Sequence, residues 1–218
     1  MKSYFERVQQ VGVSAIAELR RIDAQHTEMH RAYLEDRQKG NLTEQGYRSL
    51  VKVLDDTRTR KESEFTAQLD KIQQEYQAAV DDYCMPSASK MDSADIELLR
   101  NFEISASEFD KLAKKHRDNP TMGRFLESYR KEHGVPTNWR YQTPEERKEI
   151  FNSMRVGVDS VIRNLDKDHS DREGAVSRLT ANAYHKLQGS DPDALPTPTG
   201  GSDAVGSGRN KPAGFSLF

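Results

Sequence analysis

Two histidines in the N-terminal part of the chain have the spacing of a metal-ligand pair. His26 and His30 are four residues apart, so both imidazoles lie on one face of a helix and could supply two ligands to a zinc ion. The segment departs from the His-Glu-x-x-His motif of zinc proteases, because Glu28 does not directly follow His26. Since no third ligand is indicated, the sequence predicts half-buried histidines at a helix–helix contact and no bound metal.

The single cysteine, Cys84, is the other candidate for reactive chemistry. We expect it at the C-terminal end of a long helix, which is not the end that activates a thiol. The chain also lacks the Gly-x-Ser-x-Gly, Gly-x-x-x-x-Gly-Lys-Ser/Thr and Gly-x-Gly-x-x-Gly motifs. The sequence therefore predicts a non-enzymatic protein with no catalytic, cofactor-binding or metal-binding residue.

The last five residues are the strongest local candidate for partner binding. Phe215, Leu217 and Phe218 follow a Gly-, Ser- and Pro-rich segment, and peptides of this kind bind when their apolar side chains fill pockets on a partner. Gly-Phe-Ser-Leu-Phe resembles the motif by which bacterial proteins bind the replication sliding clamp, usually Gln-Leu-Ser-Leu-Phe. Only Ser-Leu-Phe matches, since Gly214 and Phe215 replace the glutamine and the first leucine. The resemblance implies docking on the clamp; docking on another protein, or an idle apolar end, remains open.

The composition indicates an elongated shape. Only 34% of the 218 residues are hydrophobic, 31% are charged, and the mean hydropathy is −0.89, whereas soluble domains typically carry about 45–50% apolar residues when glycine is included. We therefore expect a thin apolar stripe along extended helices. The chain shows neither the continuous apolar segment of a signal peptide nor a membrane span, and its lone cysteine fits a reducing bacterial cytoplasm.

The charge balance disfavours nucleic acid as the main partner. Lys and Arg number 33 against 35 Asp and Glu, a formal charge of −2, so the global positive field of non-specific nucleic-acid binding is missing. Local basic clusters occur at 58–61, 114–117 and 130–131, but acidic residues interleave with them. We expect these clusters to be solvated helix faces.

Heptad spacing predicts a long antiparallel, coiled-coil-like hairpin over residues 1–84. One helix runs from about Ser3 to Gln38, and Gly40 can adopt the left-handed conformation that ends it. A second helix runs from about Thr43 to Cys84, and the side chain of Asn41 or Thr43 caps it. Residues 55–64 contain no hydrophobic side chain, and we expect them to be a solvated stretch or a polar docking patch. The apolar stripe is the candidate self-association seam, and it comprises Phe5, Val8, Leu19, Ile22, Phe65, Leu69, Ile72 and Tyr76.

Capping signals predict short helices after the hairpin, so the fold class is all-α. Residues 92–134 form a small module of three helices, about Ser93–Asn101, Ala106–Arg117 and Pro120–His133. Asp92, Ser105 and Asn119 are the expected caps of these helices. Residues 143–188 form two C-terminal helices, from Thr143-Pro144 to about Lys167 and from a cap at Ser170 to about Leu187. Residues 189–218 are expected to be a disordered tail, because their composition cannot bury enough apolar surface.

One block of the small module carries a family resemblance. Asp95-Ile-Glu-Leu-Leu99, Ser105–Leu112 and Asn119–Met122, followed by Arg124, Leu126 and Tyr129, resemble small helical proteins encoded among the head genes of tailed phages and prophages. The likeness covers about 40 residues, none of which carries diagnostic chemistry. It implies a scaffolding or minor structural role in head assembly.

The leading hypothesis is therefore a phage head scaffolding or minor structural protein. It predicts a homo-oligomer that binds capsid protein in the cytoplasm of a bacterial host and can be virion-associated. The alternative is a bacterial or phage adaptor whose C-terminal peptide docks on a partner such as the sliding clamp.

Overall fold

The structure is a computed structural model that describes residues 2–165 and 171–188, and within these ranges it is all-α. None of the described helices is long and apolar enough to cross a membrane. The helices are α1 (Lys2–Gln38), α2 (Glu44–Cys84), the short 3-10 turn η1 (Ala88–Lys90), α3 (Ser93–Asn101), α4 (Ala106–Lys115), α5 (Pro120–His133), α6 (Pro144–Arg163) and α7 (Arg172–Gln188).

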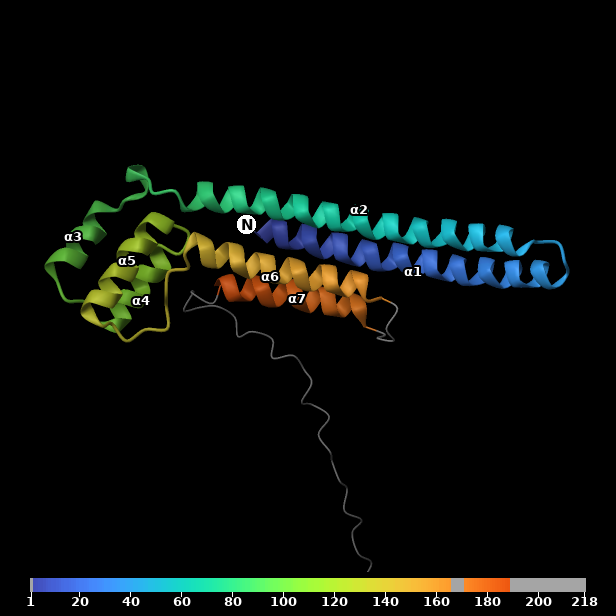
Figure 1. The fold of residues 1–218 in the computed structure, drawn as a ribbon. Coiled ribbons are helices and arrows are strands. Elements are labelled where there is room, and N and C mark those ends of the chain that lie inside the picture. Colours follow the sequence, from blue (N-terminus) through green and yellow to red (C-terminus); the bar gives the residue numbers. More distant parts are fainter. Residues whose placement is uncertain (1, 166–170, 189–218) are drawn as a thin grey trace, which may run out of the picture.

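A long antiparallel hairpin of α1 and α2 is the backbone of the molecule, as predicted (Figure 1). At the turn, Gly40 has a φ of +77°, a left-handed conformation that glycine adopts without the steric cost of a Cβ atom. The Thr43 hydroxyl then accepts a hydrogen bond from the amide of Gly46 and caps α2. Helix α2 ends at Cys84, just before Met85-Pro86, since the residue before a proline disfavours the helical conformation.

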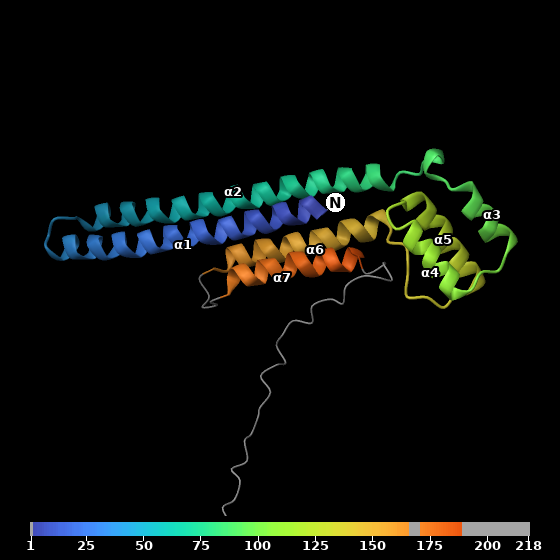
Figure 2. The ribbon, with the colours of Figure 1, turned by 180° about the vertical axis from the view of Figure 1, so that it is seen from behind.

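The helices α6 and α7 lie along one half of this hairpin and complete a four-helix bundle (Figures 1 and 2). Helix α6 begins with a full capping box, in which Thr143 and Glu146 satisfy each other's backbone amides. An aromatic group lies at its centre, where the rings of Tyr76 and Phe151 stack with centroids 3.9 Å apart and Phe5 packs edge-on against Phe151. The fully buried side chains of the bundle include Val8, Ile16, Leu19, Leu69, Tyr76, Val80, Phe151, Val158, Ile162 and Val176.

The helices α3, α4 and α5 form a small domain at one end of the bundle (Figure 1). Asp92, Ser105 and Asn119 cap the three helices through their side chains, which were the caps predicted from the sequence. The core of the domain comprises Leu99, Phe109, Ala113, Leu126, Tyr129, Val135 and Trp139. Trp139 belongs to the segment 134–143 between α5 and α6, so this connector contributes to the core of the small domain.

Two helix ends differ from the prediction. Helix α4 ends at Lys115 rather than Arg117, and α6 ends at Arg163 rather than near Lys167. The amide of Asn164 still bonds to the carbonyl of Ser160, so the chain leaves the helix within one turn of the expected end. The predicted cap at Ser170 and the predicted disordered tail, 189–218, lie outside the described residues.

Candidate functional site

The predicted self-association seam lies inside the chain's own bundle. Seven of its eight side chains are buried and Phe65 is partly buried, and Leu19, Leu69 and Tyr76 have no exposed surface. Their cover comes from apolar side chains of α6 and α7, such as Phe151 and Val176. Self-association through this stripe would require α6 and α7 to leave it, and the sequence alone could not show that they cover it. Self-association through another surface stays a prediction.

Beyond the reach of α6 and α7 the hairpin continues as a two-helix arm, residues 23–64 (Figures 1 and 2). At 1.5 Å per residue, the part of α2 in the arm is about 30 Å long. No side chain of the arm is fully buried. Met29 is 39% exposed and Val53 is 61% exposed, so even apolar residues of the arm are open to contact with another molecule.

Polar side chains join the two helices of the arm. The ring of His30 lies 2.8 Å from the hydroxyl of Tyr47, and Nε2 of His26 lies 3.3 Å from a carboxylate oxygen of Asp55. Arg58 bridges the helices, since it pairs with Asp23 on α1 and with Glu62 on α2. The two histidines therefore lie at the helix–helix contact, as the sequence predicted, and residues 55–64 interrupt the apolar stripe with ion pairs.

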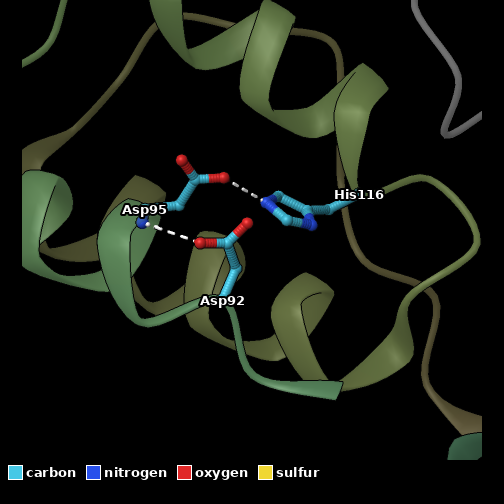
Figure 3. Close-up of side chains that lie close together, drawn as sticks. All are labelled: Asp92, Asp95 and His116. Atoms are coloured by element: carbon cyan, nitrogen blue, oxygen red, sulfur yellow. Dashed lines mark hydrogen bonds and ion pairs between the residues drawn. The ribbon is translucent and has the colours of Figure 1, made fainter. Parts of the chain in front are cut away.

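A second cluster of chemically competent groups joins α3 to the end of α4 (Figure 3). Asp92 caps α3, because its carboxylate accepts a hydrogen bond from the backbone amide of Asp95 at 3.2 Å. Nε2 of His116 lies 2.5 Å from Oδ2 of Asp95, and the ring is only 7% exposed. Nζ of Lys115 donates to Asp92 at 3.0 Å and to Asp95 at 2.7 Å. The two carboxylates thus face one imidazole and one ammonium group.

The types of these side chains are those of a metal site, because two carboxylates and an imidazole have ligand atoms within 4.8 Å of one another. The ammonium group of Lys115, however, already occupies the position between the carboxylates that a cation would take. Partial burial opposes ionisation of Asp95, but the hydrogen bonds from Lys115 and His116 outweigh it and lower the pKa of that carboxyl group. The arrangement is therefore a charge-paired clasp between α3 and α4.

Sequence reasoning found the cap at Asp92 but missed this cluster. His116 lies in the basic run 114–117, which reads as a solvated helix face. Ion pairs offset the positive charge of this run, since Lys115 pairs with Asp92 and Asp95. The basic pair 130–131 is offset in the same way, because both side chains pair with Glu127.

A pocket of about 460 Å³ lies where the small domain meets the bundle. Its wall is mixed: aromatic rings come from Tyr83 and Trp139, and cationic groups come from Arg140 and Arg147. These cations are engaged, since Arg140 pairs with Glu146 and Arg147 lies over the ring of Tyr83 at 5.7 Å. This junction pocket depends on how the connector crosses between the domains, which no local pattern in the sequence encodes.

Two further candidates from the sequence are Cys84 and the C-terminal docking residues. Cys84 is 2% exposed and lies at the C-terminal end of α2, within the bundle core. The candidate docking residues Phe215, Leu217 and Phe218 lie outside the described residues.

Comparisons with models of protein families, with curated proteins and with solved structures find no match to this chain.

Proposed function

We propose that this chain is a non-enzymatic assembly protein that binds protein partners through its two-helix arm. The observation that supports this is the unequal cover of the hairpin: α6 and α7 bury one half, whereas no third helix among the described residues covers residues 23–64. A projecting arm rich in charged groups provides a long contact surface with a defined register, because a rigid bundle fixes one end of it. Neither the clasp nor the junction pocket offers a contact surface as long as that of the arm.

The partner we propose is the capsid protein of a tailed phage, with this chain as a scaffolding or minor structural protein of the head. The support for it is the resemblance of residues 95–129 to proteins of phage head-gene clusters. In this proposal the chain acts in the bacterial cytoplasm during assembly and can remain in the virion. Self-association would use the arm, because the apolar stripe of the bundle is already covered.

Co-expression with the capsid protein tests this function. We expect the chain to change the yield or the diameter of capsid particles, measured by sedimentation and negative-stain microscopy. The matched variant lacks residues 24–37 and 44–57, which removes two heptads from each helix and keeps the turn. It should retain the melting temperature of the bundle and lose the effect on capsids. Unchanged assembly with the intact chain would refute the capsid role, and an effect that survives in the variant would refute the role of the arm.

A second candidate function is that of an adaptor whose segment Gly214–Phe218 docks on the replication sliding clamp. Its support is the Ser-Leu-Phe match, since apolar anchors carry most of the energy of such peptides. Phe218→Ala should abolish capture of purified clamp, whereas Val205→Ala, which lies before this segment, should leave it unchanged. Equal capture by both variants would remove this candidate.

A further inference from the structure

A groove of about 290 Å³ runs between α3 and α5 on the small domain. Its apolar wall consists of Ile96 and Leu99 from α3 and of Phe125 and Tyr129 from α5. It is separate from the clasp, which joins α3 to α4, and from the junction pocket, which faces the bundle.

An exposed aromatic residue, Phe102, follows α3 and bonds to the groove wall through its backbone. Phe102 is 67% exposed, although its carbonyl oxygen accepts a hydrogen bond from the hydroxyl of Tyr129, a residue of the groove wall. A phenylalanine so open to water is unusual, since Phe109 in the same domain is fully buried. The surface therefore has the character of a docking site for a short apolar peptide.

We propose that the groove binds the segment Gly214–Phe218 of the same chain. This segment offers Phe215, Leu217 and Phe218, three large apolar side chains within four positions. The groove has room for one or two of them. No other stretch of residues 189–218 contains a pair of large apolar side chains, so the match in chemistry is specific to this segment.

The point of attachment makes the contact possible within one chain. Helix α7 ends beside the small domain, because Leu187 lines the junction pocket together with Gly123 of α5. From Gly123 to the far end of the groove at His133 is about 15 Å along the helix. Residues 189–213 separate α7 from the segment, and Gly- and Ser-rich linkers of that length span about 25–30 Å. Such a tether raises the local concentration of the segment to the order of millimolar.

The junction pocket is the competing site for the segment, since it lies nearer to α7. Its wall includes Arg117, Arg140 and Arg147 together with Asp118, and burying these groups under an apolar peptide would cost their solvation. The α3–α5 groove carries fewer ionisable groups, namely Arg100, Glu132 and His133. The apolar segment therefore favours the groove.

Photo-crosslinking of the full chain tests this proposal. The Ser216→Cys variant takes a benzophenone maleimide at the segment, because Cys84 is only 2% exposed and does not compete for the reagent. After irradiation, mass spectrometry should find adducts concentrated in residues 96–102 and 125–133. Adding Phe215→Ser and Phe218→Ser should lower their yield about fivefold or more, since large apolar anchors carry most of such binding energy. The control Ser207→Cys, labelled in the same way, should give scattered adducts.

Mixing ¹⁵N-labelled and unlabelled chains identifies which chain supplies the segment. We expect adducts within one isotopic species at every protein concentration. Adducts that join the two species would mean that a second copy occupies the groove. Adducts on the arm, on the junction pocket or spread over the surface would overturn the proposal, as would a yield that the two serine substitutions leave unchanged.

Discussion

The two halves of the hairpin are made of the same two helices but are stabilised in different ways. In the bundle half, α6 and α7 cover the apolar stripe, and side chains such as Leu19 and Leu69 have no exposed surface. In the arm no residue is fully buried, and contacts such as Arg58 with Asp23 join the helices. Burial of a leucine is worth about 1.5–3 kcal/mol, whereas an exposed ion pair contributes about 0.2–1 kcal/mol. The bundle should therefore hold most of the stability, and the arm should open locally first.

A matched pair of leucines on α2 gives the largest expected difference between the halves. Leu69→Ala, in the bundle, should lower the free energy of unfolding by about 3 kcal/mol, because it removes a fully buried side chain and leaves a cavity. Leu54→Ala, in the arm, should cost about 1 kcal/mol, because this side chain is half-exposed. Urea unfolding followed by circular dichroism measures both. Equal losses would mean that the arm is covered as the bundle is.

This contrast also shows what the sequence could and could not encode. Helix ends follow from local groups, so the caps at Thr43, Ser105 and Thr143 were predictable. The heptads predicted the hairpin, but a heptad does not say which surface covers it. The ring of Tyr76 is covered by Phe151, which lies 75 positions further along the chain. Such a long-range contact has no local signal in the sequence.

The candidate sites show the same difference between local signals and long-range packing. The cap at Asp92 is local and was predicted, whereas its neighbour His116 comes from another helix and was missed. The groove between α3 and α5 likewise depends on how two helices pack, so its wall could not be derived from periodicity. The exposure of Phe102, whose carbonyl bonds to Tyr129 of the groove wall, contradicts the usual burial of phenylalanine and could be found only in the structure.

The clasp of the small domain is intermediate between the buried bundle and the exposed arm, because its charged groups are partly buried. Lys115 and His116 lower the pKa of the Asp95 carboxyl group in the folded state, so its ionised form stabilises the fold. That contribution is present above the pKa of the unfolded chain and is lost as the pH falls through the lower, folded pKa. Asp95→Asn should cost about 1–2 kcal/mol at neutral pH and flatten the loss of stability in acid. Hydrogen exchange of α3 and α4 from pH 6 to pH 3 measures this effect, and an unchanged pH profile would contradict it.

Two glycines provide a pair with opposite expected signs. A Cβ atom at Gly12 would lie 2.8 Å from Cγ1 of Val176 and 3.0 Å from Cγ1 of Val158, so Gly12→Ala should destabilise the bundle by about 1 kcal/mol net of the better helix propensity of alanine. At Gly46, beside the turn at the tip of the arm, the nearest atom is the flexible end of Leu42 at 3.2 Å. Gly46→Ala should therefore be neutral or stabilise by up to about 1 kcal/mol. Thermal unfolding compares them, and a stabilised Gly12→Ala would show that α1 and α7 are not in close contact.

The smallest expected effect concerns the ion pairs of the arm. Arg58 is 23% exposed and contacts both Asp23 and Glu62, so Arg58→Ala should cost about 0.5–1 kcal/mol. The cost should appear as faster hydrogen exchange within residues 23–64 and should shrink in 1 M salt, where the screening length falls to about 3 Å. Arg48→Ala is the matched control, because Arg48 is 78% exposed and pairs only with Glu44 within its own helix. If both variants leave exchange in the arm unchanged, its helices are held together by the rings of His30 and Tyr47 and by the apolar side chains rather than by charge.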